Sequence, residues 1–189
     1  MKNNTTRFLV AIILALNAVL APAAVLASAK TESEIKAAYI YKFVLLLKWP
    51  DDKELKDDVA AEVNICTLGV ENIGDLQAVS LAATQRSKGL RTFKVVPRNN
   101  WAGVGGACHI FYIGNSQAAS VGAIVNDLQN QPVLTVSDIN GFAKAGGMIE
   151  FSHIDDKVKI GVVNKGAAAK AGLRIDPGLF EVALKVISG

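Results

Sequence analysis

The segment Cys108–Ile113 (CHIFYI) is almost continuously apolar, and it is followed at once by the turn-forming residues Gly114, Asn115 and Ser116. A strand that is apolar without alternation is buried on both faces. Such burial is typical of parallel sheets that carry helices on each side. This segment therefore predicts a parallel strand within an α/β fold.

The rest of the chain fits that class. Strands predicted at 62–69, 91–97 and 132–136 are interleaved with helices predicted at 73–83 and 117–129. The strands at 148–153 and 157–163 are separated by three residues, which indicates an antiparallel hairpin. Two helices are then expected, at 164–173 and 177–188. We predict one α/β sandwich over residues 30–189, with a mixed sheet of about six strands, parallel ones plus this hairpin, flanked by helices.

A helix predicted over 32–48 lacks a polar face. Thr31 and Glu34 have the spacing of a capping box at its start. Its lysines, six residues apart, point in three directions, so the helix is expected to be covered on more than one side. The side turned away from the sheet carries Ile40, Tyr41, Val44 and Leu45. We expect this side to contact a client protein or a second copy in a homodimer, unless the C-terminal helices of the domain cover it.

Residues 1–29 have the pattern of a secretory signal peptide. Lys2 and Arg7 precede the apolar run Phe8–Ala21, and Ala27-Ser28-Ala29 offers a cleavage site before Lys30. We therefore expect a periplasmic mature protein of residues 30–189. Without the two basic residues of this segment, 18 basic residues face 17 acidic ones. This balance, with no basic stripe, argues against a nucleic-acid partner.

The chain has two cysteines, Cys66 and Cys108. An even number in an oxidising compartment indicates one disulfide, and the alternative is a pair of buried free thiols. Their spacing does not suit zinc, and two histidines are too few for a metal site.

We find no catalytic or cofactor-binding motif in the sequence. No G-x-G-x-x-G or P-loop turn follows the first strand, and no G-x-S-x-G elbow surrounds Ser137. We therefore expect neither enzyme activity nor a cofactor. Ser137 and Asp138 follow a strand where open α/β sheets bind ligands, so they mark a candidate ligand crevice. The simpler alternative is that Asp138 caps the turn that follows.

Several blocks, in order along the chain, resemble the YfiR family. The first four are KAAYIYKF at 36–43, KWP at 48–50, CTLG at 66–69 and CHIFYI at 108–113. The later ones are LTVSD at 134–138, FA at 142–143, GGMIEF at 146–151, VN at 163–164 and AGL at 171–173. The resemblance covers essentially all of residues 30–189.

This resemblance implies a regulatory function. The best-known members are periplasmic repressors that bind the periplasmic sensor region of an inner-membrane diguanylate cyclase, which keeps cyclic-di-GMP and biofilm formation low. A peptidoglycan-associated outer-membrane lipoprotein can sequester them, and the redox state of their cysteines affects their folding. Some members have a second cysteine pair that this chain lacks. The alternative is a periplasmic small-ligand-binding sensor, or an accessory protein for a sensor kinase or outer-membrane receptor.

Overall fold

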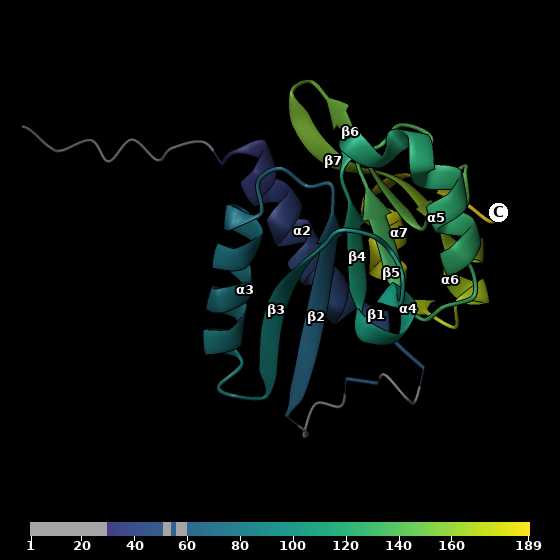
Figure 1. Cartoon of the computed structure of the whole chain (residues 1–189). Coiled ribbons are helices and arrows are strands. Elements are labelled where there is room, and N and C mark those ends of the chain that lie inside the picture. Colours follow the sequence, from purple (N-terminus) through teal and green to yellow (C-terminus); the bar gives the residue numbers. More distant parts are fainter. Residues whose placement is uncertain (1–29, 51–53, 56–59) are drawn as a thin grey trace, which may run out of the picture.

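A seven-stranded sheet in the order β3-β2-β4-β5-β6-β7-β9 forms the middle layer of the protein (Figure 1). This computed structural model describes residues 30–50, 54–55 and 60–189, so the predicted signal peptide lies outside the described residues. The five parallel strands are β2 (Ala61–Leu68), β3 (Arg91–Arg98), β4 (Ile110–Ile113), β5 (Leu134–Ser137) and β6 (Ile149–Ile154). The strand β7 (Lys157–Asn164) runs antiparallel to β6, and β9 (Ala183–Ile187) runs parallel to β7. The predicted mixed α/β sheet with its hairpin is confirmed, with seven strands in place of about six.

Helices cover both faces of the sheet (Figure 1). One face carries α2 (Glu32–Leu46) and α3 (Gly74–Arg86), and the other carries α4 (Val104–Ala107), the 3-10 helix η2 (Asn115–Ser120) and α5 (Val121–Leu128). All four residues of β4 are buried. Ile110 and Tyr112 belong to the core on the α2 side, and Phe111 and Ile113 to the core on the α5 side. This two-sided burial explains why the strand is apolar without alternation.

The first helix begins as predicted and ends two residues early. Thr31 and Glu34 form the full capping box. After Leu46 the chain is extended: β1 (Leu47–Lys48) pairs with β8 (Arg174–Ile175) in a small antiparallel ribbon. Trp49 is buried, and its indole N–H donates to the carbonyl oxygen of His109 at 3.3 Å. Burial of this large side chain holds the segment after Leu46 against the core, so the helix does not continue.

The helix predicted over 177–188 is wrong beyond its first two turns. The structure has α6 (Lys165–Lys170), then α7 (Pro177–Val182), then the edge strand β9. Leu179 is buried, whereas Val182, Leu184 and Val186 are exposed. The free edge of β7 offers backbone partners that the local sequence cannot reveal, and Val186 and Ile187 are β-branched residues that favour a strand.

Candidate functional site

An ionic cluster joins α2 to the carboxyl ends of the central strands. The Lys36 ammonium donates to Asp138 Oδ2 at 2.6 Å and also to Glu32 one helical turn earlier. The side chains of Lys36 and Asp138 are only 9% and 10% exposed. Glu32 also meets Nε2 of His153 at 2.8 Å, which ties the start of α2 to the β6–β7 hairpin (Figure 1). A buried ion pair of this kind fixes α2 relative to β5, since removing Lys36 would leave the buried Asp138 carboxylate without its cation.

The electrostatics of this cluster keep Lys36 and Glu32 charged near neutral pH. Burial alone would lower the pKa of Lys36, but the hydrogen bonds to Asp138 and Glu32 outweigh it and raise that pKa. The hydrogen bond from Lys36 lowers the pKa of Glu32 despite partial burial. Burial, followed by the charges of Asp138 and Glu32, raises the pKa of Tyr112 well above its ordinary value. Tyr112 therefore stays a neutral hydroxyl that can both donate and accept.

A pocket of about 230 Å³ lies beside the cluster, between α2 and the segment that follows β2. Its lining includes Lys36 from α2, Asn72 from the β2–α3 connection and Tyr112 from β4. The chain leaves β2 toward one edge of the sheet and leaves β4 toward the other, so the pocket lies at the topological switch point. Open α/β sheets bind ligands at this position, outside the carboxyl ends of the strands.

The two residues of the predicted crevice have different surroundings. Asp138 contacts Lys36, which lines the pocket, but Asp138 itself is not part of the lining. Ser137 is fully buried on the other face of the sheet: its hydroxyl donates to the Ile113 carbonyl oxygen and accepts from the Ile139 N–H. Ser137 is therefore unavailable to a ligand and has a structural role, and that half of the prediction needs correction.

Neighbouring polar residues also hold loops in place. The buried carboxylate of Glu150 accepts from the backbone N–H groups of Gly141 and Ala143. The Asn164 side chain donates to the Ala143 carbonyl oxygen and accepts from the N–H of Ala167, which caps α6. These bonds satisfy backbone groups that the 138–148 loop would otherwise bury unpaired.

The four residues of the predicted partner surface differ in how far they are buried. Ile40 and Val44 lie in the core of the domain, at 1% and 7% exposure, so they are not available to a partner. Tyr41 is partly buried and packs edge-on against Phe93, with ring centroids 5.4 Å apart. Leu45 is 65% exposed. Of the four predicted residues, Leu45 is therefore the one left available to a partner. The sheet and α3 cover the other three.

Leu45 borders the largest of the described cavities, a groove of about 820 Å³ at the C-terminal end of α2. Leu46 and Leu47 continue the apolar surface, and Ile175 and Pro177 contribute from the β8–α7 segment. Arg91 and Arg174 also line it. The groove therefore combines apolar and charged side chains, as protein-binding surfaces do.

Cys66 and Cys108 form a disulfide, with their Cα atoms 5.9 Å apart. Both residues are buried in the core on the α5 side. The bond joins β2 to the segment that leads into β4, and α4 and α5 cover it. The predicted pairing is present in the structure, and its burial gives it a structural role.

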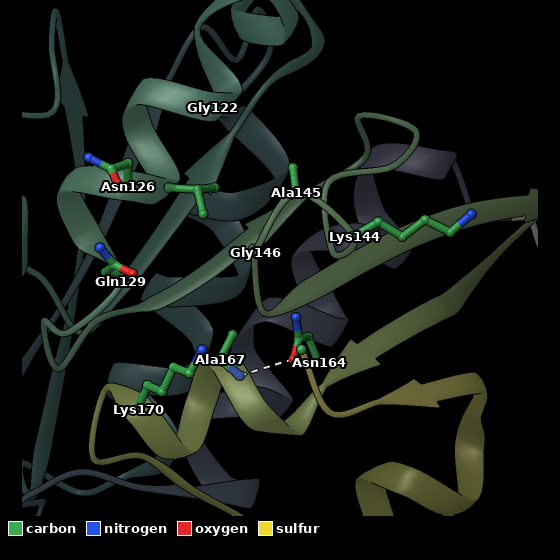
Figure 2. Close-up of a pocket in the computed structure, with 11 residues that line it drawn as sticks. Gly122, Asn126, Gln129, Lys144, Ala145, Gly146, Asn164, Ala167 and Lys170 are labelled. Carbon is green, nitrogen blue, oxygen red and sulfur yellow. Dashed lines mark hydrogen bonds between the residues drawn. The ribbon is translucent and has the colours of Figure 1, made fainter.

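A third cavity, of about 340 Å³, lies between α5, the 144–146 loop and α6. Two lysines line it, but Figure 2 shows the Lys144 side chain extending away from Lys170, so their ammonium groups do not meet. Both are exposed. The pair therefore does not form a convergent anion site. Within residues 30–50, 54–55 and 60–189 there is no cluster of histidine, cysteine and acidic residues suited to a metal ion.

A comparison with protein families decides the assignment. The YfiR/HmsC-like family model matches residues 33–184, which is most of the chain. The chain belongs to the YfiR/HmsC-like family. Its membership is consistent with a regulatory, non-catalytic protein of the periplasm. No helix in the described part of the chain is long and apolar enough to cross a bilayer.

Comparisons with individual proteins add less about this YfiR/HmsC-like chain. No curated protein matches it. One similar solved structure is that of a conserved domain protein from Vibrio cholerae O1 biovar El Tor strain N16961, with 12% sequence identity and a TM-score of 0.49. The match covers 84% of this chain and 61% of that one, so our chain spans about three fifths of its length.

The sequence blocks of the YfiR/HmsC-like family now have physical roles. The block at 36–43 forms the middle of α2, the tryptophan of KWP anchors the turn after it, and the cysteine blocks form the disulfide. Sequence reasoning missed the Glu32–Lys36–Asp138 cluster. The one signal was Lys36 itself, a charged residue within an apolar helix whose partner lies 102 residues away.

Proposed function

We propose that this protein binds the periplasmic sensor region of an inner-membrane diguanylate cyclase and represses it, which lowers cyclic-di-GMP signalling. The observation that carries the proposal is the family match over residues 33–184. The absence of a catalytic motif in the sequence agrees with a regulator, which needs a contact surface and no reactive group. A peptidoglycan-associated outer-membrane lipoprotein that sequesters the repressor is part of the same proposal.

We place the contact with the client at the groove around Leu45. The side chain is a large exposed apolar group at the edge of a groove lined by further apolar residues, and burying it against a partner would be favourable. Interfaces typically depend on a few such buried anchors within a polar border. A second copy of the chain could use the same groove, and this is where we place the expected homodimer contact.

Leu45→Asp should abolish repression without unfolding the protein. Deleting the gene in its bacterium should raise cyclic-di-GMP, and the wild-type gene should restore the low level, whereas the Leu45→Asp gene should not. The reason is that a carboxylate replaces an apolar anchor at a site that water already reaches in the free protein. The measurements are cellular cyclic-di-GMP and the melting temperature of each purified protein.

Leu81→Asp is the matched control, since Leu81 is also a helical leucine and is 61% exposed on α3, outside the groove. It should repress like the wild type. If deletion leaves cyclic-di-GMP unchanged, the proposed function is wrong. If both variants repress fully, the groove is not the contact surface. Sedimentation of the same proteins tests the homodimer, which should dissociate only in Leu45→Asp.

We also propose that the chain is exported and cleaved after Ala29. The charged start, the apolar run and the Ala-x-Ala site carry this proposal. Protein recovered from the periplasm should have an intact mass that begins at Lys30. A membrane-bound product that retains residues 1–29 would contradict it.

A small-ligand sensor remains the second candidate function, and one observation favours it: a pocket at the topological switch point of the sheet. The two functions are compatible, because a regulator can be controlled by a ligand that it binds at a different place from its client.

A further inference from the structure

The lining of the switch-point pocket contains both polar and apolar side chains. Glu32, Lys36 and Tyr112 contribute charge and hydrogen-bonding groups, and Ile40, Val70 and Leu76 contribute apolar surface. Binding sites for small molecules combine these same two features, an apolar lining and a few convergent polar groups. A volume of about 230 Å³ is below the ~300–1,000 Å³ of sites for drug-sized molecules, so the occupant must be small.

The Tyr112 hydroxyl is the first feature that suits this pocket to a ligand. Tyr112 is only 7% exposed, and it lines the pocket. Its hydroxyl makes no hydrogen bond to any residue that the structure describes, and it is not sealed from solvent, so it is open to the pocket. A polar group on a bound molecule would satisfy it.

The excess of negative charge in the ionic cluster is the second feature that suits this pocket to a ligand. Two carboxylates, Glu32 and Asp138, share the single ammonium of Lys36. Asp138 lies outside the pocket lining, and its Oδ1 is buried without a hydrogen-bond donor. His153, the other group that faces Glu32, is nearly half exposed on the hairpin. Both carboxylates also act on the Tyr112 hydroxyl, and they disfavour negative charge there. The pocket is therefore unsuited to an anion and suited to a cation.

We propose that this pocket binds a small organic monocation, with a primary ammonium head between the Tyr112 hydroxyl oxygen and the Glu32 carboxylate and a short alkyl body against Ile40, Val70 and Leu76. Lys36 does not oppose such a ligand, because its own charge is balanced by the buried Asp138. The site is independent of the proposed repression of a cyclase, and it exists whether or not the protein has that client.

Three probes of equal chain length separate the head groups: n-butylammonium chloride, 1-butanol and sodium butyrate. Each is titrated into the purified periplasmic protein at constant ionic strength, and the shifts of backbone amide NMR signals are followed. We expect saturable shifts of residues 33–40 and 70–76 with butylammonium, weaker binding of butanol and no binding of butyrate. Absence of saturable shifts with butylammonium, or tighter binding of butyrate, would overturn the proposal.

Two variants test the residues named for the head group. Tyr112→Phe removes only the hydroxyl, and Glu32→Gln removes only the charge; the capping box of α2 uses Glu34, so the start of the helix is preserved. Each should weaken butylammonium binding by about tenfold or more, the usual effect of losing a hydrogen bond to a charged group. Tyr41→Phe is the control, since Tyr41 lies outside the lining, and its affinity should not change. An unchanged affinity in a folded Tyr112→Phe protein would refute the site.

Discussion

Val44→Asp should unfold the domain or lower its free energy of unfolding by several kcal/mol. Val44 is 7% exposed and belongs to the large core cluster between α2 and the sheet. A carboxylate there either remains charged without a partner or takes up a proton at the expense of stability, and it also replaces an apolar contact. A domain of this size is stable by only about 5–15 kcal/mol. The measurement is urea denaturation followed by circular dichroism.

Leu45→Asp is the matched control, because it introduces the same charge one residue later on the same helix. Leu45 is exposed, so its free energy of unfolding should change by less than about 0.5 kcal/mol. The two variants together therefore separate core from surface along α2. A folded Val44→Asp protein of normal stability would show that this side of α2 is not covered by the domain, and it would restore Val44 to the partner surface.

The difference between Val44 and Leu45 shows how much of α2 the sequence could predict. An apolar pattern around the whole helix indicates that more than one side is covered. It cannot say what covers each side, because that depends on chain segments far away in sequence. Ile40 and Val44 pack inside the domain, whereas Leu45, one residue further, remains exposed. The capping box was predictable because both of its residues lie within four positions.

The same limit applies to the sheet and to the site. The apolar strand predicted at 108–113 and the short hairpin link were local signals. Both elements are present in the structure, the strand at 110–113. The strand β9 was missed because its only sheet neighbour is the open edge of β7, a partner set by topology. Asp138 was identified from its position after a strand, but its partner Lys36 lies 102 residues earlier and has no pattern of its own. Ser137 was misjudged because adjacent residues of a strand point to opposite faces.

The disulfide should supply a large part of the domain's stability. Replacing both cysteines with alanine should lower the free energy of unfolding by about 2–5 kcal/mol. The bond closes a loop over a sequence separation of 42 residues, and the chain-entropy model gives roughly 4 kcal/mol for such a loop. Urea denaturation of the oxidised wild type and of the double variant measures the difference. Mass analysis without reductant should show the wild type about 2 Da lighter than its reduced form, as one lost pair of hydrogens requires.

A third protein sample distinguishes the stabilisation due to the cross-link from that due to the packing of the sulfur atoms. Both cysteines are buried in the core on the α5 side, so alanine also leaves a small void there. Wild-type protein that is reduced while unfolded and then refolded keeps both sulfur atoms and loses only the bond. If the cross-link accounts for the stabilisation, the reduced wild type and the double variant should be destabilised almost equally. If the reduced wild type is as stable as the oxidised protein, the bond contributes nothing and the packing account holds. Two freely alkylatable thiols in protein purified under native, non-reducing conditions would contradict the pairing itself.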